Sequence, residues 1–516
     1  LLSFILSLVV LFGFDHNAEF QYTEHVVWLE GIGVSYFMGV DGIAVLLVAL
    51  TTLLSLIAVI WSWDTIRVRH AEYFIAILLL ETGMLGVFMA LDLFIFYIFW
   101  EVMLIPMALL IGIWGSTNRV YAAVKFFLYT LFGSLLMLLG IIATYQAYYN
   151  QTGERTLNIL KLQEGAGLGA YSSTFQFWVF AAFFIAFAVK VPMFPFHTWL
   201  PDAHTEAPTA ASVLLAAVML KMGGYGMLRF NLPLFPQGSS DWAPIVITLS
   251  IIGIIYGALV AIVQPDFKRL VAYTSVSHMG FVTLGIFLMS LQGMDGAMMV
   301  MLAHGFNTGG LFLIIGVIYE RAHTRQISAF GGLATRMPRW SFYFLVFMFA
   351  SIGLPGLSGF VGEFLVALAT WDYNPWAAFF TFVVVIFAAW YLLWCYQRVV
   401  FGRAWGEAPE PLDNMLTPGE KQELAAMGGH GHGDLGMHPV SGGDHDAHDG
   451  PAGGYPTHEG QVNSLGWKDL SLKEVLTLAP LAILTLFYGI YPKSVFDIAE
   501  PSFKAILEGA SRIVGN

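Results

Sequence analysis

The sequence predicts an all-α protein that crosses a membrane many times. Hydrophobic residues make up 57% of its 516 residues and charged residues only 11%, whereas soluble domains carry roughly 25% charged residues. Thirteen apolar runs each approach the ~20 residues that a helix needs to cross a bilayer. Two of these runs are interrupted by proline, which frees backbone carbonyls and bends a helix. Broken helices at membrane depth are tolerated only inside protein or beside a water-filled cavity, so the pattern is typical of a transport protein.

The apolar runs give the expected spanning helices. We place them near residues 1–13, 39–62, 73–90, 92–115, 120–148, 175–201, 208–230, 243–264, 268–290, 295–319, 340–370, 376–400 and 472–491. Most are apolar on all sides, as in a bundle of spanning helices. They are expected to be helical because lipid cannot satisfy exposed backbone groups. The first run starts at Leu1 without the basic start and cleavage site of a signal peptide. We therefore expect the numbering to begin inside a longer protein, with a fourteenth span upstream.

The two interrupted runs divide the chain. Pro192 and Pro195 break the run 175–201, and Pro355 breaks the run 340–370, five spans later. Corresponding breaks in two halves indicate an internal repeat with transport sites. The predicted divisions are N-terminal helices at 1–90, a first half at 91–230, a second half at 243–400, a loop at 402–470, and a C-terminal transmembrane helix with a tail at 471–516.

The loop at 402–470 differs from the rest of the chain. It is rich in Gly, Pro, Asp and Glu and contains His430, His432, His438, His445, His448 and His458. Such a composition cannot bury enough apolar area to fold alone, so we expect a solvated, flexible cytoplasmic insertion. A His-rich tract can also bind metal or collect protons, but no pair here has the spacing of a strong zinc site. We predict no metal site.

The composition also excludes several functions for this chain. One cysteine, Cys395, rules out a disulfide framework, a cysteine-ligated iron–sulfur cluster and a zinc ribbon within the chain. No glycine-rich phosphate loop precedes a soluble helix, so we predict no nucleotide site. The formal net charge of −12 argues against binding nucleic acid. Redox chemistry or ATP hydrolysis would have to occur in another polypeptide.

Lysine and arginine predict the orientation, because cytoplasmic loops carry the excess of these residues. One set of alternate loops holds most of them, namely Arg67, Arg69, Arg119, Lys268, Arg269, Arg321, Arg325, Arg336, Arg339, Arg398 and Arg403. The other set holds little beyond Arg155, Lys161 and the tail residues. We therefore expect the first set on the cytoplasmic side and the C-terminus outside.

Two lysines lie deep in apolar runs. Lys190 is about fifteen residues into its run, roughly 22 Å, and Lys221 lies thirteen residues past Pro208, roughly 20 Å. A charge near the bilayer centre costs at least ~2.5–3.5 kcal/mol, so each lysine indicates an ion or proton pathway. Glu101 is the predicted partner of Lys190, because buried opposite charges keep each other ionised. The alternative is a static ion pair that locks two helices, although buried pairs stabilise weakly.

Three further groups extend this pathway. His278 and His304 lie near mid-membrane on successive spans, and histidine relays protons through either ring nitrogen. The alternative for each is a histidine merely hydrogen-bonded in a core. Glu363 follows the second proline break, where a carboxylate could pass protons to water on the far side. Lys221 has no acid in its own run, which suits a residue that accepts and releases a proton.

Other polar residues are weaker candidates. Lys125 could belong to the pathway or snorkel to an interface, and Glu81 is deep without an obvious partner. The segment HTWLPDAHTEAP supplies His197, Asp202, His204 and Glu206, which we expect at or near the membrane surface. For Asp202 and Glu206 we expect a solvated loop or a helix cap.

Several long motifs identify a family resemblance. The segments are FWEVMLIPM, FAVKVPMFPFHTWLPDAHTEAPT, LKMGGYGMLRF, DFKRLVAYTSVSHMGF, AHGFNTGGLFL and GLPGLSGFVGEF. They closely resemble the antiporter-like subunits of respiratory NADH:quinone oxidoreductase, complex I, over residues 40–400 and again over the last span. That family is similar to the Mrp sodium/proton antiporter subunits. The resemblance implies fourteen spans in two inverted five-helix halves, with discontinuous helices near 175–201 and 340–370.

Two features favour the M-type branch of the family, the counterpart of mitochondrial subunit four. The second broken helix has glutamate in VGEF where the other branches resemble one another in carrying lysine, and no long lateral helix follows residue 491. The resemblance implies roles for six residues. Glu101 and Lys190 match the ion pair of the proton channel, Lys221 the central lysine, His278 and His304 relay positions, and Glu363 the exit residue. It says nothing about 402–470.

The resemblance also implies partners and a location. We expect the other membrane and peripheral subunits of complex I, including two other antiporter-like subunits, and surrounding lipids. FMN and iron–sulfur clusters are expected in those partner subunits and no cofactor in this chain. The expected location is the bacterial inner membrane, in preference to the mitochondrial one.

The resulting hypothesis is a proton-translocating subunit of an enzyme that reduces ubiquinone with NADH. Quinone reduction in other subunits would change the electrostatics along a central polar row, and this chain would move protons outward. The alternatives are a subunit of an Mrp-type Na⁺/H⁺ antiporter or of a membrane-bound hydrogenase. A purely structural scaffold is disfavoured by the number of deep charges.

Overall fold

The computed structural model describes residues 1–17, 19–401 and 467–514. The chain divides into two units, Leu1–Gly402 with Lys468–Asn516, and Arg403–Trp467. The helices and strands described below belong to the first unit. The predicted insertion at 402–470, with its six histidines, falls almost entirely outside the described residues.

The N-terminal part contains a β-hairpin that the sequence analysis did not predict. After the short apolar helix α1 (Leu2–Phe12), strands β1 (Gln21–Leu29) and β2 (Val34–Val40) pair in antiparallel fashion around the turn η1 (Glu30–Ile32). The strands are rich in β-branched and aromatic residues, as strands prefer. Gly33 ends the turn at φ +73, and a Cβ there would lie 2.0 Å from the Arg155 carbonyl oxygen. Only glycine fits this approach.

Eleven helical segments are long and apolar enough to cross a membrane within the described residues. Continuous among them are α2 (Gly42–Thr65), α3 (His70–Met89), α6 (Arg119–Thr152), α8 (Ser173–Lys190), α13 (Pro236–Ile262), α14 (Phe267–Phe287), α15 (Leu291–Ala322), α19 (Pro375–Tyr396) and α22 (Leu472–Ile490). Helices α4 (Leu93–Val102) and α5 (Leu104–Trp114) together form one further span. All eleven match predicted runs, which confirms the membrane-protein fold class.

The two remaining predicted runs are shorter in the structure. One is α1, and the other is the second interrupted run, which forms α17 (Pro338–Ile352) and α18 (Ser358–Tyr373). Gly353 lies between them at φ +86, where glycine is favoured. The first interrupted run likewise ends as α8 at Lys190 and resumes as α9 (Trp199–Glu206). Both proline breaks that the sequence predicts are therefore present.

The span after the first break is irregular, whereas we expected a single regular helix. It runs through α10 (Thr209–Leu214), the π-helical turn η2 (Leu215–Met219), α11 (Leu220–Gly226), the π-helical turn η3 (Met227–Asn231) and α12 (Leu232–Leu234). Single π turns inside α-helices occur frequently at functional sites. Here they flank the short helix that carries Lys221.

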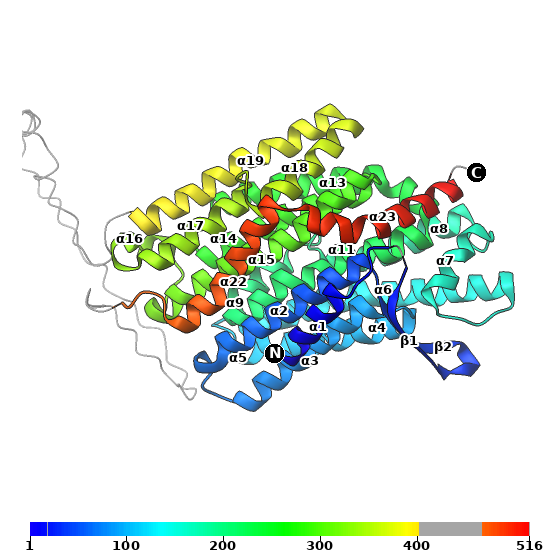
Figure 1. Ribbon diagram of the computed structural model, residues 1–516, viewed down its shortest axis with the longest axis horizontal. Helices are drawn as coiled ribbons and strands as arrows, with labels where there is room; N and C mark the ends of the chain where they lie inside the picture. Colours follow the sequence, from blue (N-terminus) through cyan, green and yellow to red (C-terminus); the bar gives the residue numbers. More distant parts are fainter. Residues whose placement is uncertain (18, 402–466, 515–516) are drawn as a thin grey trace, which may run out of the picture. The chain divides into compact units, whose positions relative to one another are not determined.

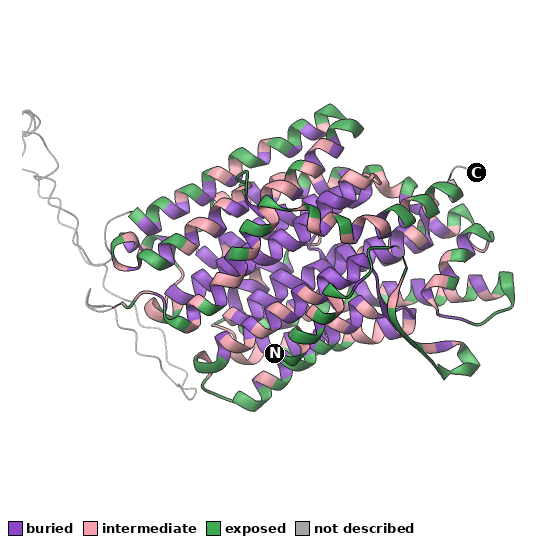
Figure 2. Ribbon diagram, viewed as in Figure 1, coloured by how far each residue is buried: buried purple, intermediate pink, exposed green. Residues whose placement is uncertain are grey.

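The core is the group of helices around α15. The most apolar stretches of α15 and of the span Thr209–Leu234 are completely buried, and that of α14 is 94% buried. Figure 2 shows these helices in purple, surrounded by helices with exposed outer faces. A helix buried on all sides has no contact with lipid, so its polar side chains face other protein groups. The central helices can therefore hold a polar row away from lipid.

The predicted C-terminal tail is an amphipathic helix, α23 (Lys493–Val514). It packs against α2, α12, α13 and α15, and Figure 1 shows it in red, leading to the C-terminus. Val495, Ala499 and Phe503 are buried, and their four-residue spacing places them on one face. The remaining elements are short, namely α7 (Ile159–Gly167), η4 (Ile327–Ala329), α16 (Leu333–Arg336) and η5 (Gln397–Phe401).

Candidate functional site

Four predicted site residues form a row through the central helices. The Nζ atom of Lys221, on α11, lies 2.6 Å from Nδ1 of His304 on α15. Nδ1 of His278, on α14, lies 2.8 Å from Oε1 of Glu363 on α18. The rings of the two histidines have their centroids 5.8 Å apart. The row therefore connects the helices that follow the two breaks through groups that can all exchange protons.

The π turn before Lys221 fixes the direction of its side chain. Nζ of Lys221 donates a hydrogen bond to the Ala216 carbonyl oxygen at 2.6 Å, in the turn η2. The same nitrogen reaches His304. When the lysine is charged, Nδ1 of His304 must accept, and the ring carries its proton on Nε2. The contact thus prepares a transfer from the ammonium to Nδ1 of the imidazole.

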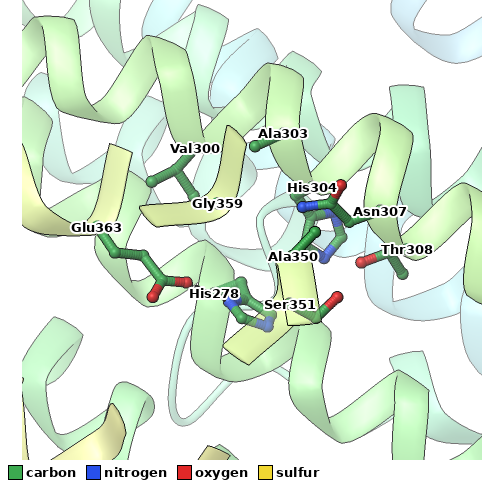
Figure 3. A pocket seen from close by; sticks show the side chains of 10 residues that line it. All are labelled: His278, Val300, Ala303, His304, Asn307, Thr308, Ala350, Ser351, Gly359 and Glu363. Atoms are coloured by element: carbon green, nitrogen blue, oxygen red, sulfur yellow. Dashed lines mark hydrogen bonds and ion pairs between the residues drawn. The ribbon is translucent and has the colours of Figure 1, made fainter. Parts of the chain in front are cut away.

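Glu363 lies in the second turn of α18, directly after the break. A Cβ built on Gly353 would approach its Oε2 to 3.1 Å, so glycine at the break leaves room for the carboxylate. Figure 3 shows Glu363 and His278 directed toward each other beside a small cavity. His278, His304, Asn307, Ser351 and Glu363 are among the residues that line it. The break therefore places the carboxylate at one end of the polar row.

The predicted ion pair between Glu101 and Lys190 is not formed. Lys190 is buried, and its Nζ lies over the ring of Trp100 at 5.3 Å and that of Phe126 at 5.7 Å. Within the described residues, neither this Nζ nor Oε1 of Glu101 has a hydrogen-bond partner. Aromatic faces attract cations, and they hold the ammonium here in place of the carboxylate. Glu101 is still close enough to influence the lysine by its charge.

Two histidines that we expected near the surface are in the core. His204, on α9, is fully buried and stacks on Phe312 at 4.7 Å between ring centroids. His197 is 3% exposed and packs against Tyr256. Both ring nitrogens of His204 lack a hydrogen-bond partner among the described residues. The expectation failed because the segment is polar in sequence, yet α9 is packed between α6 and α14.

The acids of the same segment take part in specific contacts. Asp202 forms an ion pair with Lys125 at 2.7 Å and lies 3.7 Å from Arg269. It is therefore not the solvated loop residue that we expected. Lys125 is thereby tied to α9 instead of snorkelling to an interface. Glu206 accepts a hydrogen bond from the backbone N–H of Asn118 at 2.9 Å, at the start of α6. That contact agrees with the capping role expected of Glu206.

Two buried cations, Lys268 and Arg229, were not predicted from the sequence. Lys268 was counted among loop charges, but it is 6% exposed in the first turn of α14 and donates to the Ala207 carbonyl oxygen. Arg229 pairs with Asp41 at 2.5 Å and donates to the Tyr225 hydroxyl at 3.2 Å. Lys221, Tyr225 and Arg229 are spaced by four residues, so they share one helix face. From this four-residue spacing, Arg229 could have been predicted from the sequence to lie on the same buried face as Lys221.

The last candidate, Glu81, remains apart from the row. It is buried on α3, and its Oε1 has no hydrogen-bond partner among the described residues. Among the described residues, no group of three or more His, Cys, Asp or Glu side chains is arranged to hold a metal ion.

The chain matches the family model described as NADH:quinone oxidoreductase/Mrp antiporter, TM, over residues 90–388. It is 44% identical over 511 residues to NADH-quinone oxidoreductase subunit M of Rhodobacter capsulatus, covering 98% of this chain and 88% of that protein. It is 45% identical over 509 residues to NADH-ubiquinone oxidoreductase chain 4 of Chondrus crispus, with coverages of 98% and 90%.

Solved structures give the same result. A chain of respiratory complex I from Thermus thermophilus with bound NADH matches with a TM-score of 0.79 and 30% identity, covering 99% of this chain and 93% of that one. A chain of the Mrp complex from Dietzia sp. DQ12-45-1b shares the fold, with a TM-score of 0.76, 21% identity and coverages of 99% and 92%. The chain therefore belongs to the NADH:quinone oxidoreductase/Mrp antiporter transmembrane family.

Proposed function

We propose that this chain is the proton-translocating M-type subunit of NADH:quinone oxidoreductase in a bacterial inner membrane. The relatives at 44% and 45% identity carry the names of this subunit and of its chain 4 counterpart. The single observation that carries the proton-transfer role is the row Lys221, His304, His278 and Glu363, in which the first and last pairs are already in contact.

The proposed transfer starts at Lys221. Its ammonium passes a proton to Nδ1 of His304, and His304 releases its Nε2 proton toward His278. His278 then gives its Nδ1 proton to Oε1 of Glu363, and the carboxyl group releases it beyond the second break. After one passage His304 carries its proton on Nδ1 and His278 carries its proton on Nε2, so each ring must return to its starting tautomer before the next proton can pass. Lys221 is refilled from the side that carries most of the loop arginines.

Glu101 and Lys190 act by charge in this proposal. Lys190 is the last residue of α8 and α8 packs against α11, which carries Lys221. A change in the distance between Glu101 and Lys190 alters the field at Lys221 and so its tendency to hold a proton. Quinone reduction would drive that change from partner subunits, which would also hold FMN and iron–sulfur clusters.

The test is replacement of Lys221 in the assembled complex. Lys221→Ala removes the central proton donor. A positioned proton-transfer group typically contributes about 10²–10⁴-fold to a rate. We therefore expect NADH-driven proton translocation in proteoliposomes to fall by at least about tenfold. Lys161→Ala is the matched control, because Lys161 pairs with Glu154 on the surface and about half of each side chain is exposed. Normal translocation by Lys221→Ala would contradict the proposal.

The antiporter alternative is separated by a different measurement. A subunit of an Mrp-type antiporter would move protons in response to a sodium gradient without NADH or quinone. We expect no sodium-dependent proton flux from the assembled complex. The identity to the Mrp chain is 21%, which supports a common fold and leaves the transported ion to this experiment.

A further inference from the structure

The short helix α9, which follows the first break, is bound from outside at its C-terminal end. The last four carbonyl groups of a helix have no partner within the helix. In α9 these carbonyl groups belong to residues 204–207, and each accepts a hydrogen bond from another segment. The donors, in that order, are the Ser212 hydroxyl at 3.1 Å, the Arg325 guanidinium, the Ser116 backbone N–H at 2.9 Å and the Lys268 ammonium. These four contacts clamp the end of α9.

Two of the four donors are cations that belong to the helices of the polar row. Lys268 lies in the first turn of α14, which carries His278, and Arg325 follows the end of α15, which carries His304. Positive charges stabilise the C-terminal end of a helix, because the helix dipole places partial negative charge there. Arginine keeps its charge and can bind several acceptors at once through its planar fork. Arg325 is therefore the stronger fixed link between α9 and the row.

Arg325 is itself attached to the start of α14. Its Nε atom donates to Oδ2 of Asp266 at 3.1 Å, and Asp266 is the residue that caps α14. The two segments are also joined through their backbones. The N–H of Phe267 donates to the Arg325 carbonyl oxygen at 2.9 Å, and the N–H of Ile327 donates to the Pro265 carbonyl oxygen at 2.9 Å. Arg325 must therefore move together with the start of α14 and the end of α15.

The other end of α9 contacts the surroundings of Lys190. Nε1 of Trp199, the first residue of α9, donates to the carbonyl oxygen of Val189 at 2.9 Å, directly before Lys190. The Trp199 ring also packs against Phe126, with 5.4 Å between ring centroids, and the Lys190 ammonium lies over that same Phe126 ring. The eight residues of α9 span roughly 12 Å. The helix thus bridges the buried lysine and the clamp.

We propose that α9 is a strut that couples the position of Lys190 to that of α14 and α15, and that Arg325 is the positioning residue that holds its C-terminal end. A displacement of α14 and α15 carries Arg325 with it and pulls on α9 through the clamp. At the far end, Trp199 then moves the Phe126 ring beside the Lys190 ammonium. Arg325 itself exchanges no proton. The inference rests on the proton-translocating function proposed above.

The test measures the number of protons translocated per NADH oxidised by the assembled complex in proteoliposomes. Arg325→Gln removes both the charge and the fork, and Arg325→Lys keeps the charge but not the fork. Arg119→Gln is the matched control. Arg119 also donates to carbonyl groups at the end of a helix, those of Ile113 at 3.1 Å and Gly115 at 3.4 Å, but that helix is α5, directly before it in the chain. The passive proton leak without NADH and the thermal midpoint are recorded for each variant.

We expect Arg325→Gln to lower the number of protons per NADH by at least about fivefold, the lower end of typical coupling between two sites, with the passive leak unchanged. Arg325→Lys should lie between this variant and wild type, because one ammonium cannot bind Asp266 and α9 as a fork does. Arg119→Gln should match wild type. A merely structural role would lower the thermal midpoint but not the ratio. Backbone amides of residues 199–207 should exchange deuterium faster in Arg325→Gln and not in Arg119→Gln.

A wild-type ratio of protons to NADH in both Arg325 variants would overturn the strut. If Arg325→Gln does not assemble, Arg325→Lys decides, and a wild-type ratio in that variant overturns the role. An equal loss in Arg119→Gln would overturn it as well, because the effect would then follow from any missing cation at a helix end. Lys221→Ala separates this failure from that of the wider proposal. If Lys221→Ala abolishes translocation while the Arg325 variants keep the wild-type ratio, the row stands and the strut falls.

Discussion

The contacts of each buried charged residue show whether it belongs to the proton path or stabilises the fold. Lys221 and Glu363 each contact a histidine, so their partners can accept or give a proton. Arg229 contacts Asp41 instead, in a pair whose side chains are 5% and 2% exposed. Arginine stays protonated in proteins, so this pair is unsuited to relaying protons. We assign it to stability, at the junction of the N-terminus of α2 with η3.

This assignment predicts a stability effect. Asp41→Asn keeps the side-chain cap on the backbone N–H of Ala44 but leaves the Arg229 charge without a counter-ion. Breaking a buried pair in this way costs roughly 3–5 kcal/mol, so the thermal midpoint of the purified complex should fall clearly. Neutralising both partners, by Asp41→Asn with Arg229→Met, should recover part of the loss.

The control for this prediction is an exposed pair. Glu154→Gln breaks the contact with Lys161, in which about half of each side chain is exposed. Exposed pairs contribute roughly 0–1 kcal/mol, so the midpoint should hardly move. Equal midpoints for Asp41→Asn and Glu154→Gln would show that the buried pair has no special role in stability.

The sequence predicted correctly those buried residues whose burial follows from their distance to the ends of an apolar run. Lys221, His278 and His304 were predicted as buried because each is far from either end of its apolar run, and all three are. The direct contact predicted between Lys190 and Glu101 is absent, because the sequence shows that both charges are deep but not that the ammonium lies over the rings of Trp100 and Phe126. His204 was misplaced for a related reason, since a polar segment can still be enclosed by neighbouring helices.

At the scale of elements, the irregular helices position the site. Both proline breaks were predictable, because proline acts locally on its own helix. The π turns around Lys221 could not be predicted, because no residue type requires a π turn. Packing against neighbouring helices determines where such turns form. The hairpin and α23 were missed as well, since a search for apolar runs of about 20 residues passes over short strands and amphipathic helices.

The docking of α23 on α2 gives an element-level prediction. Gly42 begins α2, and a Cβ there would lie 1.9 Å from the backbone oxygen of Ile498 in α23. Gly42→Ala must therefore displace α23, at a cost of roughly 1–3 kcal/mol for overpacking. We expect faster proteolytic cleavage within residues 493–514.

Gly509→Ala serves as the control for this helix, because a Cβ at Gly509 meets nothing within 4 Å. Alanine is also the better helix former, so this variant should be as stable as wild type or slightly more stable. If Gly42→Ala and wild type were cleaved at the same rate, the close packing of α23 against the start of α2 would be refuted.

At the scale of the whole described chain, the row of polar groups connects the two predicted halves. Lys221 belongs to the span after the first break, and Glu363 to the helix after the second. The two are linked through α15 and α14, which are almost wholly buried. The sequence predicted the members of this row but not their order of contact, because contacts between helices depend on rotations that hydrophobic pattern does not specify.

The central claim is that protons leave through Glu363, and Glu363→Gln tests it most directly. Glutamine keeps the shape of the side chain but cannot accept a proton from His278. NADH-driven proton translocation should be measured in proteoliposomes with the assembled complex, beside the exposed-site control Glu154→Gln. We predict a loss of at least about tenfold for Glu363→Gln, in line with removal of a proton-transfer group. Translocation equal to that of Glu154→Gln would contradict the account.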